Sequence, residues 1–169
     1  MTIVIPGMVT ISLLSLFYCS MLPETGRKAR MQAFERQYIA HRGFHDNRSE
    51  CPENSLPAFE RAIQMGYGIE LDVQLTKDGV PVVFHDWDLK RAAGVDRKIR
   101  DCTFEELQSY RLFGSSQTIP AFEAVLELAD GRTPLIIELK AEIVHRELCE
   151  KCAALLDCYP GEYCIESFS

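Results

Sequence analysis

A stretch of strict alternation between apolar and polar residues, from Gly68 to Thr76, constrains the fold of this chain more than any other feature. In an extended strand, one face carries the apolar residues Ile69, Leu71, Val73 and Leu75, and the other carries Glu70, Asp72 and Gln74. Burying two carboxylates costs several kcal/mol unless a cation compensates. Glu70 and Asp72 therefore predict either a hard divalent cation with oxygen ligands or a solvated sheet edge where acids pair with Lys or Arg.

Apolar runs and helical patterns alternate along the rest of the chain. The pattern predicts strands over 37–40, 68–76, 81–84, 135–138 and 163–168, and helices over 54–66, 103–110, 120–129 and 143–158. Strands that alternate with helices are typical of a parallel sheet with crossover helices. A closed (β/α)₈ barrel takes ~250 residues. The expected fold class is therefore α/β, the first half of a TIM barrel, truncated inside its fourth barrel strand and preceded by one hydrophobic helix.

That hydrophobic helix is expected at the amino terminus, because residues 1–23 carry no charge. Residues 3–22 are long enough to cross a hydrocarbon layer of about 30 Å. Cations follow at positions 27, 28 and 30, which by the positive-inside rule puts the downstream domain on the cytoplasmic side. We expect a membrane anchor over 1–23, a linker over 24–36 and a catalytic domain over 37–169. A signal peptide is the alternative, although it normally carries Lys or Arg before the apolar stretch, and a buried helix is the third reading.

Charge and cysteine content exclude other classes. The 18 basic and 25 acidic side chains give a net charge of −7, which argues against a nucleic-acid partner because such proteins show a basic surplus. Seven cysteines without regular spacing argue against a disulfide framework. Cys149 and Cys152 form an isolated C-x-x-C in a helical pattern, and we interpret them as ordinary helix cysteines in a reducing compartment.

Further polar residues lie where the predicted strands end. His41 and Arg42 close the first strand, His85 closes the 81–84 segment, and Glu138 and Lys140 follow the 135–137 run. In an α/β barrel these ends form one site at the carboxyl face of the sheet. A metal and an arginine there would neutralise a phosphate, while one histidine takes a proton and the other gives one. We expect His45 and His145, which lack this placement, to be surface residues.

Several motifs, taken in order, resemble the glycerophosphodiester phosphodiesterase family. They are His-Arg-Gly at 41–43, Pro-Glu-Asn-Ser at 52–55, the segment 68–79, Val-Val-Phe-His-Asp at 82–86, Ile-Pro at 119–120 and Ile-Glu-Leu-Lys at 137–140. The resemblance extends from about Tyr38 to Ser169 and is far more specific than any single motif. Within it, the segment from Trp87 to Ile119 corresponds to a small insertion of the family.

This resemblance implies a TIM-barrel hydrolase that cleaves glycerophosphodiesters to glycerol 3-phosphate and an alcohol. It implies that His41 and His85 are the acid/base pair. It also implies substrate or phosphate contacts from Arg42, Lys140 and Asn54, with Asn54 serving alternatively as a plain helix cap. The implied ligands of one Mg²⁺ or Ca²⁺ are Glu70, Asp72 and Glu138.

Two rival functions fit the same residues. One is a phospholipase D-like enzyme that acts on intact lysolipid or sphingolipid, for which a membrane anchor at 3–22 is suggestive. The other is a non-catalytic, membrane-tethered fragment that needs a partner for the missing half of the barrel. The residues decide neither the leaving alcohol nor Mg²⁺ against Ca²⁺, since both ions prefer oxygen ligands.

Overall fold

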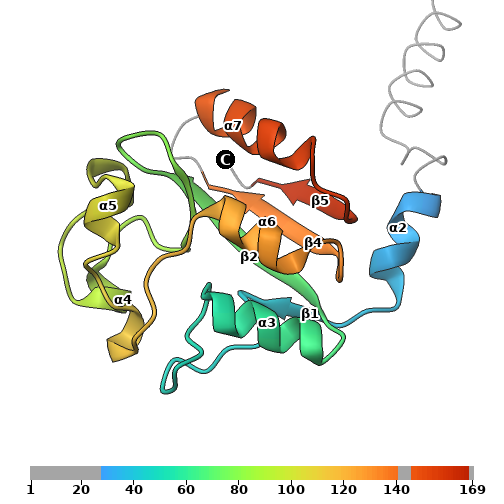
Figure 1. Ribbon diagram of the computed structural model, residues 1–169, viewed down its shortest axis with the longest axis horizontal. Helices are drawn as coiled ribbons and strands as arrows, with labels where there is room; N and C mark the ends of the chain where they lie inside the picture. The colour runs from blue at the N-terminus through green and yellow to red at the C-terminus, as the bar shows by residue number, and fades with distance from the viewer. Residues whose placement is uncertain (1–27, 141–145, 168–169) are drawn as a thin grey trace, which may run out of the picture. The chain divides into compact units, whose positions relative to one another are not determined.

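The computed structural model describes residues 28–140 and 146–167 (Figure 1). The chain divides into two units, Met1–Gln32 and Ala33–Ser169, and the second unit holds the fold discussed below. The elements are α2 (Lys28–Glu35), β1 (Ile39–His41), α3 (Leu56–Gln64), β2 (Gly68–Leu75), β3 (Pro81–Val83), α4 (Lys90–Ala93), η2 (Ile99–Asp101), α5 (Phe104–Leu107), η3 (Leu112–Gly114), α6 (Phe122–Ala129), β4 (Leu135–Leu139), α7 (Arg146–Leu156) and β5 (Tyr163–Glu166).

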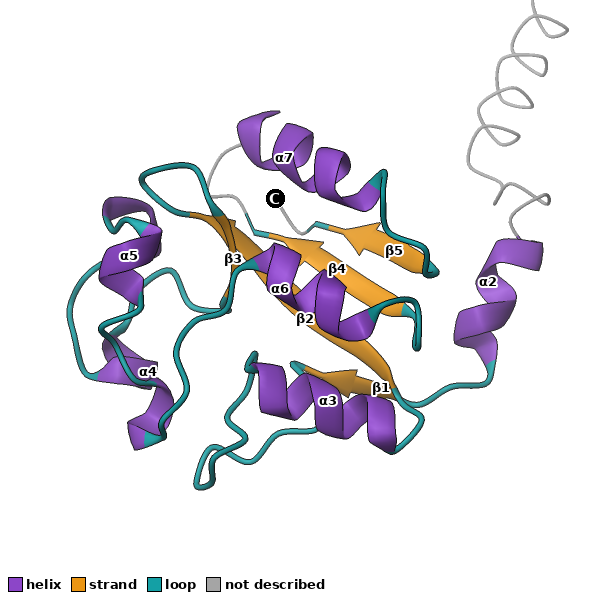
Figure 2. Cartoon of the chain, viewed as in Figure 1, coloured by secondary structure: helices purple, strands orange, loops and turns teal. Residues whose placement is uncertain are grey.

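One sheet organises the second unit (Figure 2). Its strands run β1-β2-β4-β5, each parallel to its neighbour, while the short β3 folds back antiparallel to β2. The order in space follows the order in sequence, as in successive strands of a barrel. The predicted α/β class with a parallel sheet and crossover helices is confirmed, and half of a closed barrel stays a prediction.

The alternation of β2 is resolved as predicted, with both faces buried. Ile69, Leu71 and Val73 are fully buried and pack into the main core with apolar residues of α3, α6 and α7. On the other face Glu70 is 8% exposed and Asp72 is 1% exposed. The solvated sheet edge is therefore wrong as a description of their environment, although both acids do face cationic side chains.

Local signals fix the helix starts. The hydroxyl of Ser55 accepts from the backbone of Ala58, so Ser55 caps α3 and releases Asn54 for another contact. A capping box between Thr103 and Glu106 starts α5 within the helix predicted over 103–110, but the α-helix ends at Leu107. The predicted start of the last helix at 143 lies outside the described residues, as does residue 168 of the strand expected over 163–168, whereas β5 ends at Glu166 and Ser167 lies beyond it.

The insertion between β3 and α6 has a hydrophobic core of its own. Apolar side chains from α4, η2, α5 and η3 gather there, with Leu89, Ile99, Leu107, Leu112 and Ile119 fully buried. In Figure 2, α4 and α5 lie to one side of the sheet, away from α3 and α6. The insertion is thus a compact part of the domain, with its own core, beside the carboxyl end of β2.

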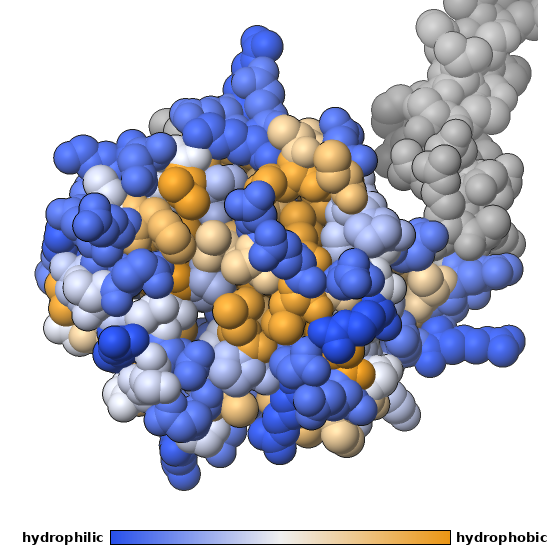
Figure 3. Space-filling model, viewed as in Figure 1, coloured by the Kyte–Doolittle hydropathy of each residue, from blue (hydrophilic) through white to orange (hydrophobic). Residues whose placement is uncertain are grey.

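The surface of the helix layer is mixed in character. Figure 3 shows hydrophilic side chains over most of the visible face and apolar side chains gathered over α6. Within the described part of the chain, none of the helices has the length and apolarity needed to cross a bilayer. The anchor expected over 3–22 lies outside the described residues.

The turn after β1 predicts a stability difference between two glycines. Gly43 has φ +82°, and a Cβ there would lie 2.9 Å from the Cβ of Ala58, whereas Gly94 has φ +72° with open space around it. We expect Gly94→Ala to cost about 1 kcal/mol for the left-handed backbone alone. Gly43→Ala adds overpacking and should cost about 3 kcal/mol, measured by urea unfolding. Equal losses at the two positions would show that the contact with α3 is not the limiting one.

Candidate active site

The register of the parallel strands sets acidic residues side by side at the carboxyl end of the sheet. Asp72 of β2 is opposite Glu138 of β4, which is opposite Glu166 of β5. Glu70 lies two residues before Asp72, on the same face of β2. Carboxylate oxygens of Glu70, Glu138 and Glu166 lie within 4.8 Å of one another. Of the predicted metal ligands the structure thus groups Glu70 and Glu138, and it adds Glu166.

Glu70 is the most perturbed member of this group. Its carboxylate accepts a hydrogen bond from the backbone N–H of Arg42 at 3.0 Å, and His41 Nε2 lies 3.8 Å away. Burial, together with the adjacent Asp72 carboxylate, raises the pKa of Glu70 to about 7. A concentration of buried negative charge is a signature of functional sites, because a fold that needed only stability would avoid it.

Asp72 is held by a different set of groups. Asn54 donates from Nδ2 to Asp72 Oδ2 at 2.9 Å, and Arg42 Nε lies 3.5 Å from the same oxygen. Lys140 Nζ is 3.4 Å from Asp72 Oδ1 and 3.0 Å from Glu138 Oε1. Among the described residues, none gives Asp72 Oδ1 a hydrogen bond. This buried oxygen can therefore accept a further hydrogen bond or bind a cation.

Asn54 and Arg42 are positioned by an unusual local backbone. Both residues have left-handed conformations, with φ of 55° and 57°. The N–H of Asn54 donates to the carbonyl oxygen of Arg42 at 3.0 Å, which joins the loop before α3 to the end of β1. Non-glycine residues with positive φ cost free energy and concentrate at functional sites. The strained pair turns both side chains toward the Asp72 carboxylate.

Behind these groups lies a salt-bridge network centred on Glu53. Arg42 Nη1 is 3.1 Å from Glu53 Oε1, and Arg91 Nη1 and Asn47 Nδ2 donate to Oε2 at 3.0 and 2.8 Å. Burial alone would raise the pKa of Glu53, but hydrogen bonds from Arg91 and Asn47 outweigh it and lower that pKa to about 2. Glu53 was not predicted as a site residue. Its signal was its place beside Asn54 in the motif at 52–55.

The same network reaches the second histidine. His85 Nδ1 and Asp86 Oδ1 are 2.7 Å apart, and Arg91 Nε donates to Asp86 Oδ2 at 2.7 Å. Burial would raise the pKa of Asp86, yet the hydrogen bonds from Arg91 and His85 lower it below its ordinary value. An ionised Asp86 can only accept, so Nδ1 of His85 carries the proton and Nε2 is the nitrogen available for proton exchange. Asp86 and Arg91 are further residues that the sequence did not single out.

His41 lies at the same end of the sheet, but its side chain is more exposed than that of His85. Its side chain is 68% exposed, and partial burial, the Arg42 charge and the neighbouring His85 all lower its pKa. His45 is exposed, as predicted, and His145 lies outside the described residues. All eight predicted site residues are therefore connected through contacts at the carboxyl end of β1, β2 and β4, with His85 reached through Asp86, Arg91 and Glu53.

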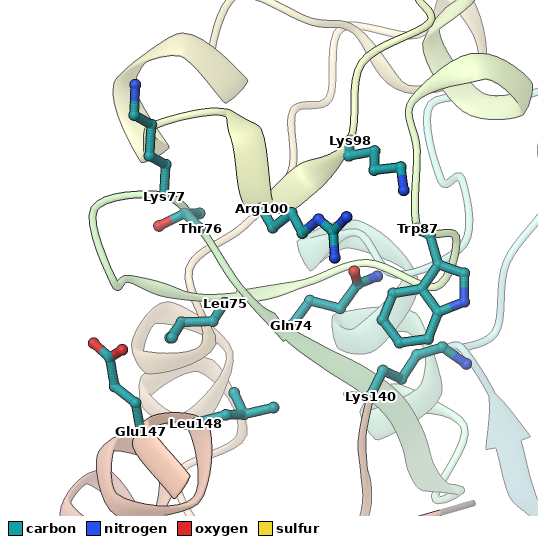
Figure 4. Close-up of a pocket in the computed structure, with 10 residues that line it drawn as sticks. All are labelled: Gln74, Leu75, Thr76, Lys77, Trp87, Lys98, Arg100, Lys140, Glu147 and Leu148. Carbon is teal, nitrogen blue, oxygen red and sulfur yellow. The ribbon is translucent and has the colours of Figure 1, made fainter. Parts of the chain in front are cut away.

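A cavity of about 290 Å³ opens next to this cluster (Figure 4). Lys140 belongs to both the cluster and the cavity wall, and Gln74 continues the polar face of β2 into it. Gln74 is itself fixed, because its Nε2 donates to the carbonyl oxygens of Phe84 and Asp86 at 2.7 and 2.8 Å. The cluster is thus adjacent to a space that can receive a ligand.

Buried acids, paired cations and two histidines thus lie at the carboxyl edge of a parallel sheet, where α/β barrels place their active sites. Residues 41–158 match the glycerophosphoryl diester phosphodiesterase family, and the chain belongs to this family. The predicted resemblance is confirmed.

Relatives by sequence carry two kinds of name. A glycerophosphodiester phosphodiesterase of Bacillus altitudinis is 44% identical over 60% of this chain and 43% of its own length. Human lysophospholipase D GDPD1 is 32% identical over 93% of this chain and 51% of its own length. The chain thus spans about half the length of the curated relatives it matches.

Solved TIM-barrel phosphodiesterases share the fold. A Thermotoga maritima glycerophosphodiester phosphodiesterase superposes with a TM-score of 0.65 at 34% identity, covering 80% of this chain and 55% of that one. An Oleispira antarctica phosphodiesterase, solved with its product sn-glycerol-3-phosphate, gives 0.72 at 30% identity, covering 81% and 59%.

The Glu53 network predicts a pH-dependent stability. A folded-state pKa of about 2 against 4.5 for the free side chain means that the stabilisation is complete above pH 4.5 and is lost as the pH falls toward 2. Glu53→Gln should lower the free energy of unfolding at pH 7 by about 2–4 kcal/mol, because two arginines lose their carboxylate. Its unfolding free energy should vary less between pH 4.5 and 2 than that of the parent.

Urea unfolding between pH 2.5 and 7 measures both effects. Glu105→Gln, at an exposed position of α5, is the matched control and should keep the parent's pH dependence. A parent and a Glu53→Gln variant with the same acid limb would contradict the assignment of that limb to Glu53.

Proposed function

We propose that this domain hydrolyses glycerophosphodiesters to glycerol 3-phosphate and an alcohol, using one divalent cation and two histidines. One observation carries this proposal. The predicted acidic ligands, the basic side chains of Arg42 and Lys140, and both histidines lie together within the segment that matches the family. The Oleispira antarctica relative, whose complex contains sn-glycerol-3-phosphate, supports the product assignment. The enzyme activity is proposed for the domain in its complete form, since this chain spans about half of its relatives.

The acidic groups fit a hard divalent ion. Glu70, Asp72 and Glu138 would hold it, with Glu166 as a further ligand, and the buried Asp72 Oδ1 that accepts no hydrogen bond among the described residues is the clearest mark of the place. Oxygen donors of this kind suit both Mg²⁺ and Ca²⁺. When bound, the ion would neutralise charge on the phosphate and polarise its oxygens.

Arg42 and Lys140 would complete the phosphate site. Each already lies against the Asp72 carboxylate, at 3.5 and 3.4 Å, and so presents its positive charge toward the cluster. Arg42 is also held from behind by Glu53, which fixes the direction of its guanidinium. Positive side chains fixed in advance stabilise developing charge on phosphate oxygens at little cost in reorganisation.

The two histidines would act on opposite sides of phosphorus. In the first step the glycerol hydroxyl next to the ester gives its proton to His85 Nε2 and its oxygen bonds to phosphorus. The bond to the alcohol breaks, and protonated His41 supplies the proton that the alcohol needs. Asp86 favours His85 as the base because its carboxylate stabilises the imidazolium that forms.

The second step returns both histidines to their starting states. Neutral His41 takes a proton from water, the water oxygen bonds to phosphorus, and the cyclic ester opens. The glycerol hydroxyl recovers its proton from His85, which leaves glycerol 3-phosphate and the enzyme as it began. Histidine suits this exchange of roles, because an unperturbed imidazole can gain or lose a proton near neutral pH.

The ligand assignment predicts the behaviour of single acids. Glu138→Gln and Glu166→Gln should each weaken Ca²⁺ binding at least about 10-fold, since even a supporting group at a metal site is worth that much. Glu162→Gln, exposed just before β5, should bind as the parent does. Isothermal titration calorimetry measures the affinities, and excess chelator should abolish turnover. Full turnover in chelator would refute the metal requirement.

The histidine assignment predicts a dependence on the leaving group. His41→Ala should lower kcat by about 10²- to 10⁴-fold for glycerophosphocholine, the cost of losing an acid. With a p-nitrophenyl ester of glycerophosphate, whose leaving group needs no proton, the loss should be much smaller. His85→Ala should reduce kcat for both substrates, and His45→Ala for neither. Equal losses for His41→Ala on the two esters would reverse or remove its role as the acid.

A lysophospholipase D activity is the second candidate, because a human relative of that name aligns with 93% of this chain. Glycerophosphocholine and lysophosphatidylcholine, compared at equal concentration, separate the two activities. A domain that binds metal but turns over neither substrate would correspond to the non-catalytic alternative. The membrane anchor over 3–22, with the domain on the cytoplasmic side, remains part of the proposal, and carbonate extraction of membranes tests it.

A further inference from the structure

The cavity beside the cluster has a wall of unusual charge. Among the described side chains that line it, four are basic, one is acidic and one is the only tryptophan of the sequence. The basic ones are Lys77, Lys98, Arg100 and Lys140, and the acidic one is Glu147. The chain as a whole carries a net charge of −7. A basic concavity in an acidic protein concentrates anions, because low-dielectric walls focus the local field.

The insertion presents these cations on a fixed framework. Ile99 of η2 is fully buried, and its N–H donates to the carbonyl oxygen of Trp87 at 3.1 Å. The backbones of Asp88 and Lys98 form an isolated antiparallel β-bridge next to that hydrogen bond. Ile99 is buried in the core of the insertion, whereas Lys98 and Arg100 on either side of it are exposed. Figure 4 shows Arg100 and Lys98 reaching toward the space above Gln74 and Trp87.

The cavity adjoins the proposed reaction site through Lys140. Lys140 lines it and lies 3.0 Å from Glu138, and Gln74 follows Asp72 on the same face of β2. Trp87 comes two residues after His85. A group attached to a phosphate held by Arg42 and Lys140 can therefore extend into the cavity without leaving the protein surface.

The chemistry of the wall selects against a cationic group. A choline headgroup would need an aromatic face free of competing charge. Lys140 Nζ already lies 5.9 Å from the centre of the Trp87 ring, and Lys98 and Arg100 share the wall. Charge-assisted hydrogen bonds from Lys and Arg are instead the usual means of holding phosphate and carboxylate.

We propose that this cavity binds the alcohol half of the substrate and favours an alcohol that carries its own anionic group, such as a phosphorylated polyol. This inference rests on the proposed function, and it adds the class of leaving alcohol. Lys98 and Arg100 bind the second anion, and Trp87 packs against the polyol ring. The volume of about 290 Å³ is at the lower end of small-ligand sites, as expected for one headgroup.

Binding is tested first, because it does not require turnover. The 169-residue chain with Ca²⁺ and saturating glycerol 3-phosphate is titrated with inositol 4-phosphate, and the fluorescence of Trp87 is recorded. We expect a saturable change with inositol 4-phosphate and none with inositol or choline. Lys98→Gln and Arg100→Gln should each weaken binding about 10-fold, while Lys90→Gln, on exposed α4, should not. Equal responses to inorganic phosphate, or unchanged affinity in the double variant, would overturn the proposal.

Kinetics then tests the substrate class. The ratio of kcat/KM for glycerophosphoinositol 4-phosphate to that for glycerophosphocholine should exceed one. It should fall about 10- to 100-fold in the Lys98→Gln/Arg100→Gln variant, because the value for glycerophosphoinositol 4-phosphate decreases while that for glycerophosphocholine stays the same or rises. Parallel losses for both substrates would refute the cavity's role in selection. Absence of turnover on every glycerophosphodiester, with inositol 4-phosphate still bound, would instead count against the proposed activity alone.

Discussion

The site depends on the burial of two carboxylates, Glu70 and Asp72, on the polar face of one strand. Charges in this environment are costly unless they are paired and hydrogen-bonded. Asn54, Arg42 and Lys140 supply that pairing for Asp72, and each comes from a different place in the chain. The strand therefore dictates where the loop before α3 and the end of β4 must lie.

The cationic and amide groups do not fully neutralise and hydrogen-bond the buried carboxylates, and for this reason the acidic cluster can still bind a ligand. Burial, together with the neighbouring Asp72 carboxylate, keeps the pKa of Glu70 raised, and Asp72 Oδ1 accepts no hydrogen bond from the described residues. Farther back, Glu53 has the opposite character, since two arginines hold it ionised. The fold thus separates a satisfied network that provides rigidity from an unsatisfied one that can accept a ligand.

Much of the fold could be predicted because its signals are local. The period of β2, the capping box at Thr103 and the cap at Ser55 are each contained within a few residues. The strand-end residues could be grouped because parallel strands terminate at one edge. Glu166 escaped prediction because one acid in a short strand has no distinguishing neighbour, and only the register with Glu138 reveals it.

Residues that contact one another from distant positions in the sequence were harder to predict. Arg91 lies in α4 yet bonds to Glu53, 38 positions away, and no periodicity links them. The role of Asp86 likewise follows from geometry, since a carboxylate next to a histidine in sequence need not bond to it. The resemblance to a family supplied the roles of Asn54 and Lys140, whose local patterns fit a helix cap and an ordinary surface lysine equally well.

The insertion between β3 and α6 carries its own apolar core, separate from that beneath the sheet. Lys98 and Arg100 flank the residue that anchors this second core, while the acids belong to strands of the first. Substitutions at the two cations therefore leave the packing of β2 and β4 undisturbed. Such a division would let the proposed headgroup preference change without altering the strands that carry the acids of the proposed reaction site. The domain therefore contains two packing units, the sheet with its helices and the insertion, each with its own hydrophobic core.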